Sequence, residues 1–200
     1  MKRRDFLKQT TFASGMFFVP QFLKAFEQLP TKTFSNKKVV IIQLKGGNDG
    51  LKEFIAAAHD RNLKVFFDII VNHSADVIKY EECHNADGSL LAGVSECTYK
   101  SLQQVADGDD YTPFVPVGEE IAKVPEWLND TQYYHNQGES TWAGENSLYG
   151  DFVGLDDIDT DNPVVVENFI GVFKDIVKDF RPDGFRVDTV KHVNTEFWQV

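Results

Sequence analysis

Apolar residues recur at helical spacing in two stretches of the chain. In the first stretch, four apolar residues stand at positions i, i+3, i+4 and i+7: Leu51, Phe54, Ile55 and Ala58. This spacing predicts an amphipathic helix that ends near Asn62. The second stretch covers residues 164–180, and Asn162 and Pro163 precede it as a helix cap and a first-turn proline.

Two apolar runs without helical spacing follow these predicted helices. Residues 64–71 form a nearly continuous apolar run, which predicts a strand buried on both faces of a parallel sheet. Asp68 interrupts this run, and a carboxylate in such a place should be paired or functional. Residues 185–189 form a second short strand. The order helix, strand, long excursion, helix, strand is typical of an α/β protein with a parallel sheet.

The excursion between the two halves shows no long period. Residues 74–153 are rich in glycine, aspartate, asparagine and aromatic residues. Loops of this length are usually functional or separately structured. Six rings could either stack on a ligand or form a small core of their own: Trp127, Tyr133, Tyr134, His135, Trp142 and Tyr149.

The first thirty residues have the pattern of an export signal. Residues 2–8, Lys-Arg-Arg-Asp-Phe-Leu-Lys, match the twin-arginine pattern, and an apolar stretch follows at 12–19. A short amphipathic helix with a basic face is the alternative. Residues 39–44 predict a strand that ends at a glycine-rich turn, residues 45–50. That turn lacks the Lys-Ser/Thr pair of a phosphate-binding P-loop.

Charge divides the chain near residue 50. Residues 1–50 carry nine Lys and Arg against three Asp and Glu, which leaves 11 basic and 28 acidic residues for the remainder. So acidic a body argues against nucleic-acid binding. No apolar run approaches the ~18 residues that span a membrane. Cys83 and Cys97 could close a small disulfide loop if the chain is exported, whereas no Cys/His set around them suggests a metal.

Candidate chemistry gathers in residues 184–193. Arg186 and Asp188 are two residues apart, so on a strand they point to the same face. A guanidinium beside a carboxylate keeps it ionised, as a nucleophile requires. Lys191 and His192 follow at the strand's carboxyl end, where chemistry collects in parallel α/β barrels. The alternative is a structural Arg–Asp pair followed by two surface residues.

Three sequence blocks point further. Residues 184–192 fit the pattern G-F-R-x-D-x-x-K-H, residues 68–73 fit D-x-x-x-N-H, and residues 154–159 read G-L-D-D-I-D. These blocks, in this order, resemble the α-amylase family of glycoside hydrolases. The resemblance implies that residues 51–200 belong to a partial (β/α)8 TIM barrel, with an irregular small domain inserted after strand three at about 74–158. Residues 1–50 resemble a different bacterial family, twin-arginine-exported and of unknown function, so residues 31–50 are expected to be of foreign origin.

The resemblance also implies roles for individual residues. Asp188 would be the nucleophile of a retaining double displacement on an α-glucan, and Arg186 would orient it. His73 and His192 would donate hydrogen bonds to hydroxyls of the sugar being cleaved, and Lys191 would contact the neighbouring sugar. Asp68 would support this pocket. The resemblance implies a structural Ca²⁺ as well. Asn72 and Asp157 would be its side-chain ligands, and the backbone carbonyl of His192 would be a third ligand.

The same resemblance leaves a gap in the catalytic set. A retaining glycosidase needs a second carboxylic acid, and the family places it on a later strand than those found here. We therefore expect a fragment that does not hydrolyse starch alone; an inactive truncated or fused product and a non-catalytic amylase-like partner remain alternatives. The partners implied are an α-glucan and the twin-arginine export machinery, with an exported, periplasmic or extracellular location.

Overall fold

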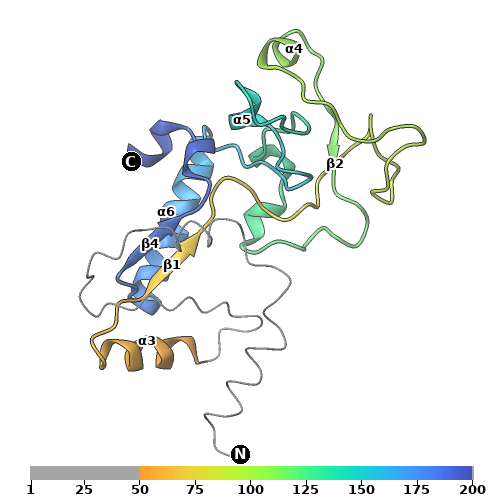
Figure 1. The fold of residues 1–200 in the computed structure, drawn as a ribbon. Coiled ribbons are helices and arrows are strands. Elements are labelled where there is room, and N and C mark those ends of the chain that lie inside the picture. Colours follow the sequence, from red (N-terminus) through yellow and green to blue (C-terminus); the bar gives the residue numbers. More distant parts are fainter. Residues whose placement is uncertain (1–49, 200) are drawn as a thin grey trace, which may run out of the picture. The chain divides into compact units, whose positions relative to one another are not determined.

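The computed structural model describes residues 50–199. The predicted export signal, the strand at 39–44 and most of the glycine-rich turn lie outside the described residues. The part that is described falls into a strand–helix portion and an irregular excursion, residues 74–158, which we call the insert (Figure 1).

Strands β1 (Phe66–Ile69) and β4 (Gly184–Val187) pair in parallel, as the sequence predicts. The register sets Asp68 beside Arg186, although the two residues are 118 positions apart. The ladder extends past β4, because the Asp188 amide donates to the Ile69 carbonyl at 2.9 Å. This pairing brings the end of β1, where Asn72 and His73 follow, beside the end of β4.

A single carboxylate fixes the start of this pairing. Asp183 accepts hydrogen bonds from the Lys64 ammonium at 2.7 Å, from the Val65 amide at 2.8 Å and from His59 Nε2 at 3.0 Å. These bonds, that of Lys64 foremost, hold the pKa of Asp183 well below its usual range. Asp183 thereby joins the turn before β4 to the chain that enters β1.

Helices α3 (Leu51–His59) and α6 (Pro163–Phe180) confirm the two helical predictions. The Asn162 side chain caps α6 by accepting from the Val164 amide, and Pro163 occupies the first turn. Arg181 then ends the helix in the left-handed conformation, with φ of 52°. The two helices contact each other and pack beside the strands (Figure 1).

The predicted burial of β1 on both faces is wrong. Phe66 is 61% exposed and Ile70 is 48% exposed, while Phe67 and Ile69 are partly covered. Within residues 50–199, β1 pairs only with β4, so nothing there covers its other edge and outer face. Asp68 is accordingly exposed rather than buried.

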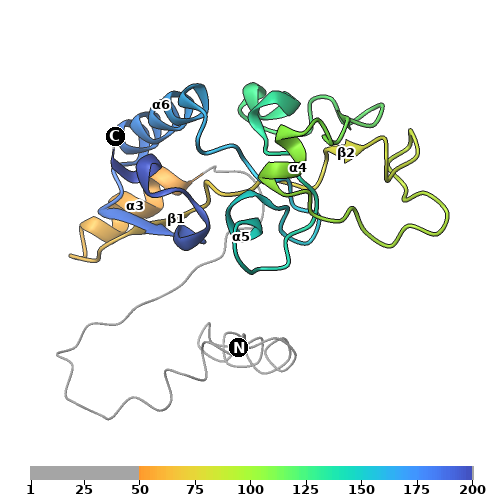
Figure 2. The same ribbon diagram turned by 90° about the horizontal axis from the view of Figure 1, so that it is seen from above.

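Short elements and loops make up the insert. Strands β2 (Lys79–Tyr80) and β3 (Pro113–Phe114) pair antiparallel, and the remaining elements are one turn or little more. These are α4 (Leu102–Ala106), η1 (Glu126–Asn129), η2 (Thr131–Tyr133) and α5 (Asn146–Tyr149). Two views agree that α4, α5 and β2 lie on the opposite side of the molecule from α3 (Figures 1 and 2).

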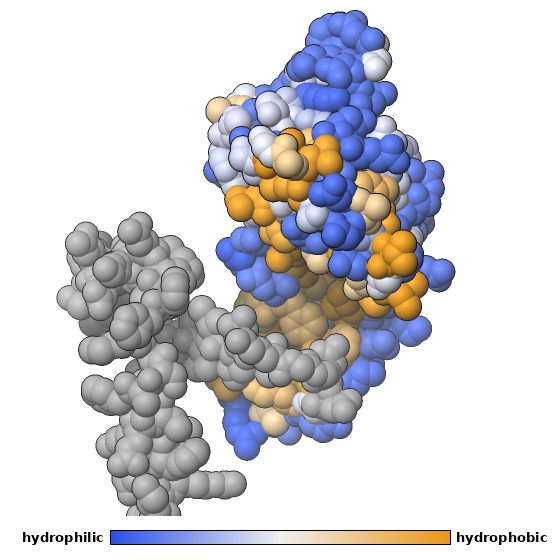
Figure 3. All heavy atoms as spheres, turned by 90° about the vertical axis from the view of Figure 1, so that its right-hand side faces the viewer, coloured by the Kyte–Doolittle hydropathy of each residue, from blue (hydrophilic) through white to orange (hydrophobic). Residues whose placement is uncertain are grey.

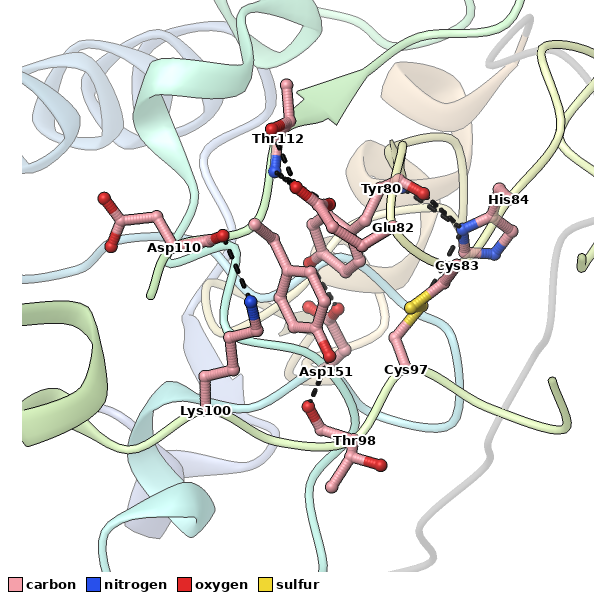
Figure 4. The surroundings of a disulfide bond; sticks show 11 residues. Tyr80, Glu82, Cys83, His84, Cys97, Thr98, Lys100, Asp110, Thr112 and Asp151 are labelled. Carbon is pink, nitrogen blue, oxygen red and sulfur yellow. Dashed lines mark hydrogen bonds between the residues drawn. A yellow bond between two sulfur atoms is a disulfide. The ribbon is translucent and has the colours of Figure 1, made fainter. Parts of the chain in front are cut away.

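A disulfide and a stacked ring pair organise the outer part of the insert. Cys83 and Cys97 are bonded, and both are buried. Tyr80 stacks on Tyr111 with ring centroids 4.6 Å apart, and its hydroxyl donates to buried Asp151 at 2.6 Å (Figure 4). The insert therefore has a small core of its own.

Aromatic contacts attach this core to α6. Trp127 meets Phe169 of α6 edge to face at 5.2 Å and Tyr133 at 5.9 Å. Phe169 also contacts Phe197, in the final short helix η4 (Thr195–Gln199). Most of the six rings singled out in the sequence thus serve packing, and Trp142, 49% exposed, is the one large apolar side chain of that group left exposed.

Apolar and hydrophilic residues occupy different parts of the insert's surface (Figure 3). Seen from the side of the insert, apolar residues gather in patches midway along the face, whereas the upper end, which holds α4, is hydrophilic (Figure 3). Among residues 50–199, no helix has the length and apolarity needed to cross a bilayer.

Candidate active site

A cluster of charged side chains lies at the carboxyl end of β4. Arg186 Nη1 donates to both carboxylate oxygens of Asp68 at 2.8 Å and lies 2.9 Å from Asp188 Oδ1. The same-face placement of residues 186 and 188 is therefore as predicted. Asp68 and Arg186 are about 60% exposed, whereas the Asp188 side chain is 35% exposed. One guanidinium nitrogen thus holds two carboxylates at the mouth of the strand pair.

Two histidines are held by a phenylalanine that the sequence analysis did not single out. The ring of Phe152 stacks on His73 at 5.2 Å and meets His192 edge to face at 4.8 Å. Burial lowers the pKa of His73, against the opposing field of Asp188, and nearby His192 lowers it further. The shared Phe152 ring brings His73 and His192 together.

The tautomer of His192 follows from one hydrogen bond. Its Nδ1 donates to the Ser147 carbonyl at 2.7 Å, and the residue is buried. In a neutral ring, Nε2 must then be an acceptor. In its neutral form, His192 can accept a hydrogen bond from a ligand hydroxyl at Nε2 but cannot donate one there.

Lys191 and Trp142 border this cluster. Lys191 lies in the short helix η3 (Val190–His192) and is exposed. Trp142, from the insert, lies 4.0 Å from the Phe152 ring and 5.9 Å from the His192 ring. An exposed indole beside His192 can offer a flat apolar face to a ligand.

Asn72 and Asp157 meet where the insert begins and ends. Both side chains are almost fully buried, and Asn72 Nδ2 donates to Asp157 Oδ1 at 3.0 Å. Asn72 Oδ1 is buried without a hydrogen-bond partner. Rotating this amide by 180° would turn that oxygen towards the carboxylate, an arrangement that a cation between them would stabilise. Two buried oxygen donors side by side fit a hard cation such as Ca²⁺.

Three further buried groups escaped the sequence analysis. Asp156 forms an ion pair with Lys123 and accepts from the backbone amides of Val77 and Ile78, both at 3.0 Å. Burial raises the pKa of Asp151 to about 8, although it accepts from the Tyr80 hydroxyl. The doubled aspartate at 156–157 was the only sequence signal, since Asp156 lies 33 positions from Lys123 and Asp151 lies 71 positions from Tyr80.

The comparison with protein families identifies the family of the chain. The catalytic domain of the alpha-amylase family matches residues 33–198. The chain belongs to the alpha-amylase family. The match begins ahead of Leu51, so part of the segment expected to be of foreign origin falls inside it. The resemblance of residues 1–50 to a twin-arginine-exported family stays a prediction.

Individual amylases are similar over the same proportion of the chain. An alpha-amylase of Streptomyces lividans is 45% identical over 169 residues, which cover 76% of this chain and 18% of that protein. An alpha-amylase of Saccharomycopsis fibuligera is 27% identical over 164 residues, or 76% of this chain and 25% of the relative. The chain thus spans about a fifth to a quarter of the length of these relatives.

A solved structure agrees in fold. The alpha-amylase of Malbranchea cinnamomea superposes with a TM-score of 0.50 at 18% identity, covering 76% of this chain and 26% of the other. This likeness concerns the fold alone. It is in keeping with two adjacent parallel strands, their helices and a long irregular excursion.

Proposed function

We propose that the chain supplies the nucleophile side of a retaining glycoside hydrolase that acts on α-glucans. The observation that carries this proposal is the placement of Asp188 at the end of a parallel strand, 2.9 Å from Arg186 and with its backbone amide bonded to the Ile69 carbonyl of the neighbouring strand. In this proposal β1 and β4 are adjacent strands of a (β/α)8 barrel, whose chemistry collects at the strands' carboxyl ends.

Each side chain then has a role in the first displacement. Asp188 attacks the anomeric carbon and forms a glycosyl-enzyme, while a carboxylic acid elsewhere protonates the leaving oxygen. Arg186 orients Asp188, and Asp68 binds the same guanidinium nitrogen. His73 and His192 contact hydroxyls of the sugar being cleaved, and His192 does so through Nε2 because its Nδ1 donates to the Ser147 carbonyl. Lys191 contacts the neighbouring sugar.

Ca²⁺ is the metal we propose for the Asn72–Asp157 pair. The fit rests on the unpartnered Asn72 oxygen beside a buried carboxylate, and the backbone carbonyl of His192 is the third ligand in this proposal. When bound, the ion joins the start and end of the insert by neutralising their crowded oxygens. For the location, we propose export through the twin-arginine pathway, on the pattern of residues 2–8.

The test uses the full-length enzyme from which this catalytic segment comes. Asp188→Asn should lower kcat by several orders of magnitude while the melting temperature changes little, because the side chain contributes one partly exposed ion pair. Asp175→Asn, an exposed carboxylate on α6, is the matched control and should leave kcat unchanged.

Chemical labelling gives a second, independent readout. A mechanism-based glycosyl fluoride should modify Asp188, as shown by peptide mass spectrometry, and should not modify the Asp188→Asn variant. Labelling of another carboxylate, or near-normal turnover in that variant, would refute the assignment and favour a non-catalytic amylase-like protein.

A further inference from the structure

A histidine and two aspartates converge where the insert returns to α6. The donor atoms of His135, Asp159 and Asp161 all lie within 4.8 Å of one another. None of these three side chains is among the proposed Ca²⁺ ligands. The cluster therefore requires a separate explanation.

His135 is fixed in one orientation, with one ring nitrogen on Asp157 and the other facing Asp159. Its Nδ1 donates to Asp157 Oδ2 at 2.6 Å, and its backbone amide donates to the Asp157 carbonyl at 3.1 Å. The side chain is 7% exposed, and the Tyr149 ring lies edge to face against it at 4.9 Å. Its Nε2 is buried without a hydrogen-bond partner, yet it lies 3.3 Å from Asp159 Oδ1.

This geometry matches the coordination of a small transition metal. Zinc–nitrogen and zinc–oxygen bonds of 2.0–2.2 Å at a tetrahedral angle place neighbouring ligand atoms about 3.4 Å apart. The observed distance from His135 Nε2 to Asp159 is 3.3 Å. A metal-bound histidine also commonly donates its other N–H to a carboxylate, which orients the ring, and Asp157 accepts this bond here.

Helix capping does not explain the two aspartates. Carboxylates often collect at helix N-termini because free amides and the helix dipole attract them. In α6 the Asn162 side chain already accepts from the Val164 amide at 3.0 Å. Asp159 Oδ1 accepts from the amide of Asp161, at 3.2 Å, and not from an amide of α6, and Asp161 is exposed.

We propose that His135 Nε2 and the carboxylates of Asp159 and Asp161 bind a divalent transition metal of the Zn²⁺ class. One imidazole and two carboxylates suit such an ion, whereas Ca²⁺ prefers six or more oxygen ligands. Exposed Asp161 leaves the fourth position to water. The metal joins the segment after η2 to the loop that begins α6, so its role is structural and separate from the proposed glycosidase chemistry.

The test measures zinc binding to the metal-stripped chain by calorimetry, with saturating Ca²⁺ present throughout. One Zn²⁺ should bind and raise the melting temperature. Asp161→Asn removes a ligand from an exposed position without disturbing the core, and should weaken binding about tenfold or more. Asp175→Asn changes the same charge on α6 away from the cluster and should bind zinc as the unaltered chain does.

Cobalt provides a spectroscopic check of the ligand set. Co²⁺ in place of zinc should give the visible absorption of a tetrahedral nitrogen–oxygen site, and His135→Gln should abolish it. Equal zinc affinity in the two aspartate variants would overturn the proposal. Displacement of zinc by Ca²⁺ would also overturn it. So would a chain that binds no zinc and shows both His135 ring N–H protons in its NMR spectrum, because this would indicate an imidazolium shared by the aspartates.

Discussion

Phe169 on α6 connects the insert to the strand–helix portion, and its removal should loosen both. The side chain is 7% exposed and contacts Trp127 of the insert, Phe173 of the same helix and Phe197 of η4. Replacing a buried phenylalanine by alanine typically costs about 3–5 kcal/mol, from lost transfer energy and the cavity left behind. For a domain of this size, that corresponds to a fall in melting temperature of roughly 6–20 °C.

The edge-to-face contact with Trp127 contributes a separable share of this energy. Such ring pairs are worth about 0.5–1.5 kcal/mol beyond the area they bury. A double-mutant cycle with Phe169→Ala and Trp127→Ala, measured by urea unfolding, should return a coupling of this size. Hydrogen exchange should also accelerate in residues 126–134, because that segment loses its anchor on α6.

Val164→Ala is the matched control on the same helix. Val164 is 50% exposed, so its truncation should change the free energy of unfolding by no more than about 0.5 kcal/mol. If Phe169→Ala cost no more than this control, or if its coupling to Trp127 were zero, the insert would not be attached to α6 as described.

Three other changes test separate features. Lys123→Met should lower the free energy of unfolding by about 3–5 kcal/mol, because it leaves Asp156 buried without its partner, whereas exposed Lys178→Met should have little effect in the same urea titration. Asp183→Asn should lower the melting temperature at pH 7. Because folding depresses the pKa of Asp183, the difference in melting temperature from the unaltered chain should shrink as the pH falls below about 4. A difference that stays constant with pH would contradict this. In the full-length enzyme, Trp142→Ala should raise KM for an oligosaccharide more than it lowers kcat, and an unchanged KM would show that the indole does not contact substrate.

Local patterns allowed the strand–helix portion to be predicted. Apolar spacing located α6, and Asn162 with Pro163 located its start, because these signals act within a few residues. The parallel pairing of β1 with β4 followed from the order of elements. The burial of β1 could not be predicted in this way, because it depends on what lies beside the strand rather than on the strand's own composition.

The site was predictable where its residues belong to one strand and unpredictable where they do not. Arg186 and Asp188 share a face because strand side chains alternate. The second partner of Arg186, Asp68, required knowledge of the β1–β4 register. Phe152, which holds both histidines, lies in a segment with no periodicity, so no local signal could single it out.

The entry and exit of the insert are hydrogen-bonded neighbours. The Ile158 amide donates to the Asn72 carbonyl at 2.8 Å, and the Ser74 amide donates to the Asp156 carbonyl at 2.9 Å. An excursion that starts and finishes at one point can change its length at little entropic cost, since loop closure grows only slowly with the number of residues. The strand before it and the helix after it keep their spacing whatever lies between. Evolution or an engineer could therefore exchange the intervening chain as a cassette, and so reshape the rim around Asp188 without rebuilding the scaffold beneath it.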